Sequence, residues 1–536
     1  MVFSQITTSP GEVASISINV DYIDSPLKAF ELATTDSNYA LLLESAEINS
    51  KDNLKSLMLV DTAVVLECRG NTVTLVAQNE NGQCANHYIK QQFEQLHSSD
   101  VVIVQQGMEL TLTFSPPDLN VNEEQRLKQV NAFESLRLII NQFKHDETDP
   151  FAVFLGGCFA YDMLGNFEQL PNVPDGNNTC PDFVYYLAET MVVIDHQNGT
   201  SEIVGNVFSG ETAYANCFSI GKRLEHIKNI FKQISPEIKD VGFDLLNGKL
   251  DFTVNISDDT FKQTVLQLKN NIVQGDIFQV VPSRCFSLPC EDSLDAYRHL
   301  KRDNPSPYMF YLKHADYVLF GASPESALKY CADTRQVEVY PIAGTRKRGF
   351  DSKGGINLDL DSRVELELRN DQKEVAEHLM LVDLARNDVA RISDTGTRCV
   401  KELLKVDRYS YVMHLVSRVV GKLKPELDAL HAYQACMNMG TLVGAPKIKA
   451  AQLIRQVEKQ RRGSYGGAVG YLNGNGDMDS CIVIRSAFVQ HNMAHIQAGA
   501  GVVYDSDPQS EADETVSKAQ AVIRAVCASQ ALLTSK

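Results

Sequence analysis

Acidic and basic side chains share one edge of a helix predicted near the end of this 536-residue chain. Glu511, Glu514 and Lys518 stand three and four residues apart, a spacing that places them on one side of an α-helix. They border the apolar stripe through which that helix would pack on its neighbours. Two carboxylates and an ammonium in this position could act on a charged ligand, but Glu514 and Lys518 could equally form an ordinary surface ion pair.

Further side chains suited to acid–base chemistry occur earlier in the chain. Glu374 and Glu377 lie one turn apart on an amphipathic helix predicted for residues 372–392. Glu325 stands at the exit of a predicted strand, and His414 lies inside another. Each also has a purely structural explanation, because carboxylates favour the start of a helix and a strand histidine is often a hydrogen-bonded core residue.

The segment before the C-terminal helix is predicted to form a meander of strands. Its middle strand, residues 480–489, contains Arg485, and its last strand, residues 494–504, contains Gly499 and Gly501. Glycine inside a strand costs stability and often marks a bulge or a point where a ligand or another backbone comes close. We therefore expect something to lie against this last strand.

The remaining elements follow from hydrophobic periodicity and from turn residues. We expect strands over residues 39–48, 151–162, 275–286 and 337–349, a hairpin over 305–328, and helices over 124–144, 211–234 and 258–274. A glycine-rich turn near Thr441 precedes another helix. It is not a phosphate-binding loop, because the Walker motif requires a lysine directly after Gly444 and Ala445 stands there.

The length of the chain exceeds what one hydrophobic core usually serves, so we expect two subdomains, residues 1–240 and 241–536, with a boundary in the aperiodic segment 235–259. A net charge of -18 argues against a general nucleic-acid or membrane-surface binder, and an anionic substrate would need a local cation cluster.

The 12 cysteines include no CxxC pair, and the N-terminus lacks the features of a secretory signal. A cytoplasmic location is therefore expected.

Seven motifs occur in one order along the chain: PIAGTRKRG, EHLMLVDLARND, GTLVGAPK, SYGGAVGYL, CIVIRSA, QAGAGVVYDSDP and EADET. Together they resemble the chorismate-binding enzyme family, and within it the branch that makes anthranilate. The resemblance covers essentially the whole chain and is most specific between residues 275 and 518. It implies an α+β chorismate-binding fold, in which large antiparallel sheets pack face to face with helices on the outside.

The resemblance also assigns a metal site. It implies one Mg²⁺ held by Glu377 and Glu514, with a ring carboxylate of the substrate completing the site, as suits a hard ion that keeps several waters. Glu374 and Glu511, each one turn earlier, would orient waters or hold Lys518. Residues matched to substrate binding are Gly344, Thr345, Tyr465, Arg485, Gly499, Ala500, Gly501 and Lys518, with Arg485, Tyr465 and the N–H groups of 499–501 on the enolpyruvyl carboxylate.

By the same resemblance, ammonia adds to the chorismate ring as a hydroxyl leaves, and pyruvate is then eliminated to give anthranilate. Glu325 matches the acid that protonates the hydroxyl, His414 belongs to the eliminating step, and Thr441 lies near the ring. Family members that add water carry a lysine where this chain has Gln279. Members that make 4-amino-4-deoxychorismate usually carry a nucleophilic lysine where this chain has Ala343.

A feedback site and a partner are implied as well. The segments 42–45 and 304–309 resemble a pocket for L-tryptophan, with Ser45, Pro307, Tyr308 and Met309 as its residues. The pocket would favour a conformation less able to close over chorismate. We find no nucleophile elbow for glutamine hydrolysis, so ammonia is expected from a separate glutamine amidotransferase subunit.

Three alternatives remain open at this point. An aminodeoxychorismate synthase is disfavoured by Ala343 and by the feedback motifs, and an isochorismate or salicylate synthase is disfavoured by Gln279. A noncatalytic tryptophan-binding regulator would be expected to have lost Glu325, His414 or a metal-binding glutamate, yet all of these are present.

Overall fold

A computed structural model describes residues 8–45, 54–97, 99–234, 252–351, 355–409 and 412–534, with side chains up to residue 530. The strands are β1 (Val13–Val20), β2 (Ala40–Glu44), β3 (Lys55–Arg69), β4 (Thr72–Ala77), β5 (Val101–Gln106), β6 (Glu109–Phe114), β7 (Phe154–Phe159), β8 (Phe183–Asp195), β9 (Thr200–Phe208), β10 (Thr253–Val254), β11 (Gln279–Val280), β12 (Ser283–Pro289), β13 (Tyr308–Lys313), β14 (Val318–Ser323), β15 (Ser326–Cys331), β16 (Gln336–Val339), β17 (Ile342–Lys347), β18 (Cys399–Arg408), β19 (Val412–Lys422), β20 (Gly444–Ala445), β21 (Ala468–Asn473), β22 (Met478–Ile482), β23 (Ser486–Gln490) and β24 (Met493–Gly499).

The helices are α1 (Pro26–Ala33), α2 (Glu80–Leu96), α3 (Glu123–Leu127), α4 (Glu134–Gln142), η1 (Tyr161–Asn166), α5 (Ala213–Phe231), α6 (Asp258–Val273), α7 (Ser293–Asp303), α8 (Leu358–Asn370), α9 (Gln372–Ile392), α10 (Ala429–Cys436), α11 (Gly440–Val443), α12 (Lys447–Glu458) and α13 (Pro508–Thr534). No helix within these described ranges is long and apolar enough to cross a membrane.

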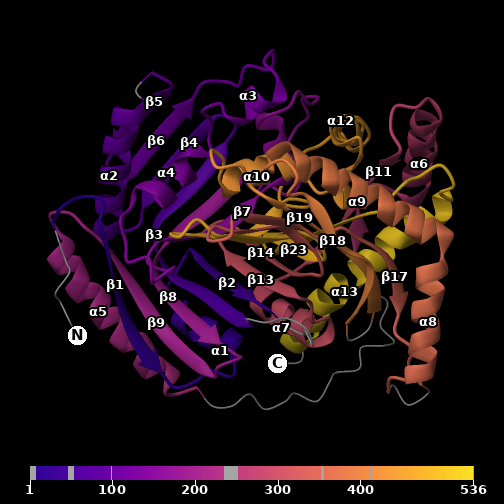
Figure 1. Cartoon of the computed structure of the whole chain (residues 1–536). Helices are drawn as coiled ribbons and strands as arrows, with labels where there is room; N and C mark the ends of the chain where they lie inside the picture. Colours follow the sequence, from indigo (N-terminus) through magenta and orange to yellow (C-terminus); the bar gives the residue numbers. More distant parts are fainter. Residues whose placement is uncertain are drawn as a thin grey trace.

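Antiparallel pairing joins strands from both ends of the chain, which confirms the α+β class. Strand β2 pairs with β3 and β13, β7 pairs with β8 and β21, and β12 pairs with β24. Figure 1 shows β2, β7 and β13 in the middle of the molecule, with α2 and α5 at one side and α6, α8 and α9 at the other. Segments that are hundreds of residues apart in the sequence thus become neighbours.

Side-chain alternation along a strand separates two cores. On β13, Phe310 and Leu312 enter one hydrophobic cluster with residues of β3, β8 and β21. Met309 and Tyr311, which point the other way, enter a second cluster with residues of α1, α7 and α13. These strands are joined into one large closed sheet, which has one core on one face and packs its other face on helices.

The helix that carries Glu374 and Glu377 begins and ends as the sequence predicts. Asp371 caps α9 by accepting hydrogen bonds from the N–H groups of Lys373 and Glu374. Ser257 caps α6 in the same way, through the N–H of Thr260. These caps fix the first turn of each helix beside the sheet.

Several predicted elements were too long. The helix expected at 124–144 is split into α3 and α4, because Asn131 accepts from the N–H of Phe133 and donates to the carbonyl of Gln129 instead of continuing the helix. The strand expected at 275–286 is interrupted at Pro282, which has no N–H to donate. The strand expected at 494–504 ends at Gly499.

Two predicted boundaries reach outside the described residues. The strand expected at 39–48 is seen as β2, and residues 46–48 are not described. Most of the predicted subdomain boundary, residues 235–251, is not described either. The strand pairs β2–β13 and β7–β21 connect the two predicted subdomains.

Candidate active site

A cavity of about 430 Å³ lies where α9, α13 and the ends of several strands meet. It collects nearly all of the side chains singled out in the sequence. The predicted residues that line it are Gln279, Glu325, Gly344, Thr345, Glu374, Glu377, His414, Thr441, Tyr465, Arg485, Gly499, Gly501, Glu511, Glu514 and Lys518. Ala500 does not line it, and the N–H of Ala500 donates to the carbonyl of Pro282 at 3.1 Å.

Arg485 interrupts the strand in which it was predicted. Its φ of 48° lies in the left-handed region, which costs free energy for a non-glycine residue, and it separates β22 from β23. Burial lowers the pKa of Arg485 below its usual value, yet no carboxylate among the described residues forms an ion pair with it. A guanidinium held in this way is a binding group for an anion.

Glu325 lies in the turn between β14 and β15 and is buried in the wall of the cavity. Removal from water raises the pKa of Glu325 to about 8, and this outweighs the hydrogen bond from Thr441 Oγ1 at 2.9 Å, which lowers it. Glu325 is therefore mostly protonated at neutral pH. A protonated carboxyl facing a cavity is suited to act as a general acid.

His414 extends from β19 into the same cavity. Burial and the nearby charge of Arg485 lower the pKa of His414 to about 3, so the imidazole is neutral. Its Nδ1 lies 2.8 Å from Thr345 Oγ1 on the neighbouring β17, which fixes the ring. Within the described residues the buried Nε2 has no hydrogen-bond partner. One nitrogen of a neutral imidazole thus faces the cavity.

Carboxylates from two helices meet at one end of the cavity. Glu374 and Glu377 come from α9, and Glu511 and Glu514 come from α13. Burial, followed by repulsion from Glu374 and Glu514, raises the pKa of Glu377, and burial together with Glu514 raises the pKa of Glu511 to about 7. Three cations compensate part of this charge: Lys518 Nζ lies 2.8 Å from Glu514, Arg346 pairs with Glu374 at 2.8 Å, and Lys373 Nζ approaches Glu377 to 4.0 Å. The cluster therefore favours an added cation.

Of the two roles expected of Glu374 and Glu511, the structure does not show the holding of Lys518. Glu374 is held by Arg346 at 2.8 Å, and Lys518 pairs with Glu514 and donates to the carbonyl of Gly499 at 3.1 Å. Lys518 is therefore not held by Glu374 or Glu511. No three acidic, histidine or cysteine side chains of the described chain form a complete metal cluster by themselves. Glu377 and Glu514 fit a Mg²⁺ ion that takes its other ligands from water and from a bound carboxylate.

The glycines of the cavity are required by contacts within the chain. Gly344 has a φ of 81°, which side chains rarely allow. A Cβ on Gly499 would approach the carbonyl oxygen of Pro282 to 2.8 Å and the hydroxyl of Tyr465 to 3.1 Å, and one on Gly501 would approach the amide nitrogen of Gln279 to 2.8 Å. The close approach expected at the last strand is thus made by the protein's own atoms. The N–H of Gly501 has no acceptor among the described residues and remains a donor at the wall.

Sequence reasoning missed two polar residues of the wall, Gln497 and Lys373. Gln497 lies two residues before Gly499 on β24, so strand alternation could have identified it. Lys373 precedes Glu374 at the start of α9, and its Nζ lies 4.0 Å from Glu377. Neither residue belongs to a motif with a distinctive spacing, so the sequence did not single them out.

A buried network supports this wall from behind. Arg462, only 1% exposed, pairs with Glu458 and donates to the carbonyls of Val281 and Leu442, two residues of the cavity wall. Glu458 accepts from the N–H and the hydroxyl of Ser283, and Gln497 donates to the same hydroxyl at 2.8 Å. The position of several wall residues therefore depends on one buried ion pair.

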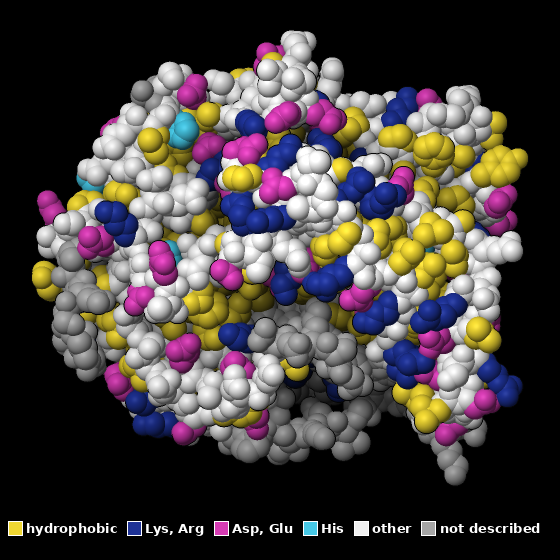
Figure 2. All heavy atoms as spheres, viewed as in Figure 1, with side chains coloured by type: hydrophobic (Ala, Val, Ile, Leu, Met, Phe, Trp, Pro, Cys, Tyr) yellow, Lys and Arg dark blue, Asp and Glu magenta, His cyan; other side chains and the backbone are white. Residues whose placement is uncertain are grey.

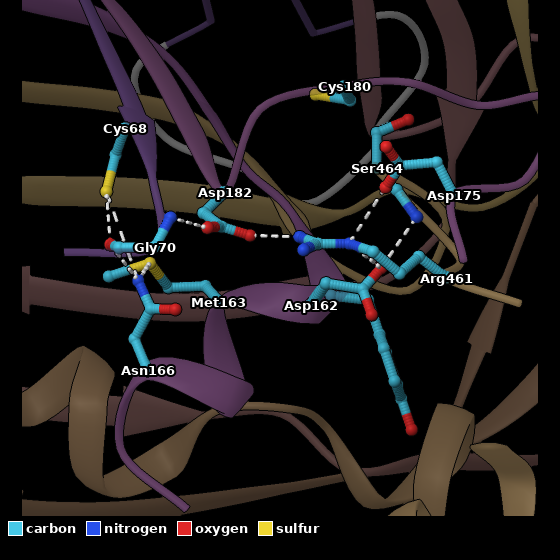
Figure 3. Close-up of polar contacts among 12 residues, drawn as sticks. Cys68, Gly70, Asp162, Met163, Asn166, Asp175, Cys180, Asp182, Arg461 and Ser464 are labelled. Atoms are coloured by element: carbon cyan, nitrogen blue, oxygen red, sulfur yellow. Dashed lines mark hydrogen bonds and ion pairs between the residues drawn. The ribbon is translucent and has the colours of Figure 1, made fainter. Parts of the chain in front are cut away.

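The segment leading to Tyr465 is anchored to the first half of the chain. Figure 3 shows Asp182, Arg461 and Asp162 in a row, with Arg461 in an ion pair with Asp182. Asp162 accepts from the N–H of Gly463 at 2.8 Å and pairs with Arg455 at 2.7 Å. Because both aspartates are almost fully buried, these contacts fix the turn that presents Tyr465 to the cavity.

The two segments predicted to form a feedback site are adjacent. β2 pairs with β13, with Glu44 opposite Met309, and Ser45 Oγ donates to the carbonyl of Pro307 at 2.9 Å. Met309 is fully buried in the core, and the hydroxyl of Tyr308 lies 3.2 Å from Asp479. The structure thus brings all four predicted residues together, outside the cavity that contains Glu325.

Comparisons with known proteins agree with this arrangement. A family model described as chorismate binding enzyme matches residues 90–524. Anthranilate synthase component 1 of Vibrio cholerae is 54% identical over 520 residues, 97% of each chain, and the protein of that name from Escherichia coli K12 is 50% identical over 505 residues, 94% of this chain and 95% of that one.

Among solved structures, the crystal structure of anthranilate synthase component I from Streptococcus pneumoniae is similar with a TM-score of 0.66 and 30% identity, covering 89% of this chain and 94% of that one. The menaquinone-specific isochorismate synthase of Escherichia coli, at 16% identity, a TM-score of 0.62 and coverage of 98% and 96%, shares the fold. The chain therefore belongs to the chorismate-binding enzyme family, among the proteins of the anthranilate synthase component 1 type.

Proposed function

We propose that this protein converts chorismate and ammonia to anthranilate and pyruvate. The observation that carries the proposal is a single cavity that joins an unpaired Arg485, a protonated Glu325 and a neutral His414 to four glutamates on two helices. Chorismate carries two carboxylates, a leaving hydroxyl and an enolpyruvyl ether. The cavity offers a separate group for each of these features.

Binding would use the two charged ends of the cavity. Arg485, with the Tyr465 hydroxyl and the N–H of Gly501, would hold the enolpyruvyl carboxylate, because a carboxylate supplies the anion that this guanidinium lacks. Glu377 and Glu514 would hold Mg²⁺, which when bound would neutralise and orient the ring carboxylate. Thr345 and Thr441 would face the ring between these ends.

The first half-reaction would form the carbon–nitrogen bond. Ammonia would attack the ring carbon next to the one that bears the carboxylate, and the ring hydroxyl would leave as water after taking a proton from Glu325. Gln279 would face the incoming nitrogen, since its buried Oε1 has no hydrogen-bond donor among the described residues and ammonia brings three N–H groups. An amide is sufficient there, because ammonia needs no base to become a nucleophile.

The second half-reaction would expel pyruvate. The free Nε2 of His414 would accept the proton from the aminated carbon while the enolpyruvyl oxygen leaves, and the ring would become aromatic. A neutral imidazole is the form required of a base. Position 343 is alanine, so the chain has no lysine at the position from which related enzymes form a covalent ring adduct.

The proposal also includes feedback regulation, a partner subunit and a cellular location. Tryptophan would bind at Ser45 and residues 307–309, and β13 would carry the effect to β14, where Tyr308 pairs with Ser323 two residues before Glu325. Ammonia would come from a glutamine amidotransferase, component II, in an assembly of large and small subunits. None of the 12 cysteines, all of which belong to the described residues, forms a disulfide, as is typical of a reducing cytoplasm.

One assay tests the activity. The purified chain, chorismate, MgCl₂ and an ammonium salt at alkaline pH should produce fluorescent anthranilate and an equal amount of pyruvate. EDTA should abolish the product, and excess Mg²⁺ should restore it. Turnover that persists in EDTA would refute the metal site, and isochorismate or aminodeoxychorismate as the only product would refute the reaction.

The role of Glu325 predicts a pH dependence. Rates expressed per concentration of free NH₃ should fall as the pH rises through about 8, because the raised pKa of Glu325 marks the loss of the proton that the acid must donate. Glu325→Gln should lower kcat by about 10²- to 10⁴-fold and abolish this decrease of the rate at alkaline pH. Thr441→Val should shift the alkaline decrease of the rate to higher pH, since the hydrogen bond from Thr441 lowers the pKa of Glu325. A fully active Glu325→Gln variant would exclude the role.

The role of His414 predicts a separation of the two steps. His414→Ala should release the aminated intermediate, still carrying its enolpyruvyl group, and form little anthranilate, because only the elimination needs the base. Chromatography and mass spectrometry of the products would measure the ratio. Equal slowing of both steps, with no intermediate released, would reject this assignment.

The feedback site predicts a separation of inhibition from activity. Ser45→Phe should leave ammonium-dependent activity unchanged and abolish inhibition by L-tryptophan, because the bulky ring fills the space beside the Pro307 carbonyl. Ser45→Ala, which removes only the hydrogen bond, serves as the milder control. Inhibition curves and tryptophan binding by calorimetry would be compared for both. Unchanged inhibition in Ser45→Phe would place the pocket elsewhere.

A further inference from the structure

An exposed apolar surface lies on the outer side of α6 and beside β11. Leu266, Val273, Phe278 and Tyr504 are 53%, 68%, 70% and 65% exposed. We propose that this surface, here named the α6 face, is the docking site of the amidotransferase subunit. The inference rests on the proposed function, because it is that function which requires a source of ammonia.

The α6 part of this face is uncharged as well as apolar, whereas Asp505 and Asp507 are exposed beside Tyr504. Leu266 and Val273 are one heptad apart on α6, and the exposed positions between and beside them are Gln263, Gln267, Asn270 and Gln274. Such a stripe is unusual in a chain of net charge -18. Large exposed hydrophobic residues with few charges are typical of the buried centre of a protein–protein interface. Figure 2 shows hydrophobic side chains gathered at the upper right, over α6.

Strand geometry places this surface next to the cavity. Val280 and Val502 exchange both main-chain hydrogen bonds, at 3.2 and 2.8 Å, as an antiparallel pair. Phe278 and Tyr504 therefore extend from the same end of that pair. Gln279, which directly follows Phe278, lines the cavity, and so does Gly501, which directly precedes Val502. The α6 face is thus separated from the cavity by a single layer of residues.

The surface is continuous from the strands to the helix. Lys269, the one charged residue between positions 263 and 275, donates to the carbonyl of Ser506 at 2.5 Å. This contact ties the loop that carries Tyr504 to the side of α6 and engages the ammonium group. The exposed positions of the helix from Gln263 to its end are uncharged, and the charged residues Asp258, Asp259 and Lys262 lie in its first turns. A partner could therefore cover helix and loop together.

Two observations favour an amidotransferase over a second copy of this chain. Gln279 keeps a buried acceptor oxygen without a donor directly behind the α6 face, where ammonia arriving from a docked partner would meet it. Two copies of a chain with net charge -18 would repel each other on approach. A partner with an apolar, uncharged patch of its own fits this surface.

The test compares two exposed side chains that differ in location. Val273→Lys places a cation in the α6 face, and it should preserve the helix because a lysine at the last residue of α6 interacts favourably with the helix dipole. The control is Phe218→Lys on α5, where Phe218 is 61% exposed. Binding of component II would be titrated for the unmodified chain and both variants. Ammonium-dependent and glutamine-dependent activity would be measured in parallel.

We expect Val273→Lys to weaken binding of component II by about tenfold or more. Glutamine-dependent activity at limiting component II should fall with it, while ammonium-dependent activity stays unchanged. Phe218→Lys should match the unmodified chain in all three measurements. If Val273→Lys does not fold, Leu266→Lys provides the same comparison.

Unchanged binding of component II to Val273→Lys would overturn the docking site. So would a Val273→Lys chain that loses self-association in sedimentation while it still binds component II, because the surface would then belong to a second copy. Failure of the proposed function would be seen separately, as absence of ammonium-dependent anthranilate formation in the unmodified chain. The binding titration does not depend on that chemistry.

Discussion

The site depends on charge that the fold removes from water without fully compensating it. Arg485 has no carboxylate partner among the described residues, Glu325 is buried enough to raise its pKa to about 8, and glutamates of α9 and α13 gather at one end of the cavity. Each of these groups costs free energy in the ligand-free protein. A dianionic substrate and a divalent cation would together supply the missing charges. Binding energy and the positioning of reactive groups then have the same physical source.

Such a site needs a rigid frame, because uncompensated groups would otherwise turn toward solvent or toward one another. The frame is formed by interactions behind the wall. The Arg462–Glu458 pair holds Val281, Leu442 and Ser283, and Asp162 and Asp182 hold the turn before Tyr465. Cap and strand contacts do the same for α9 and for His414.

The antiparallel sheet also connects the predicted tryptophan site to Glu325, the residue proposed as general acid. β2 pairs with β13, β13 pairs with β14, and β14 ends two residues before Glu325. A shift of β13 by even a fraction of an ångström would move the turn that carries this carboxyl. Sheets transmit such shifts because their hydrogen-bond ladders leave little freedom between neighbouring strands.

The sequence by itself determined the α+β class, the helix that carries Glu374 and Glu377, the hairpin of β13 and β14, and the family. These follow from local periodicity, caps, turn residues and ordered motifs, which need no knowledge of distant contacts. Only the tertiary structure decided where strands break. Arg485 adopts a left-handed backbone conformation between two strands, and the last strand ends at Gly499, where Pro282 and Tyr465 leave no space for a side chain. The protonation state of the buried side chains was likewise decided only by the tertiary structure. Whether Glu325 carries a proton depends on how much water its neighbours exclude, and those neighbours come from segments more than a hundred residues away.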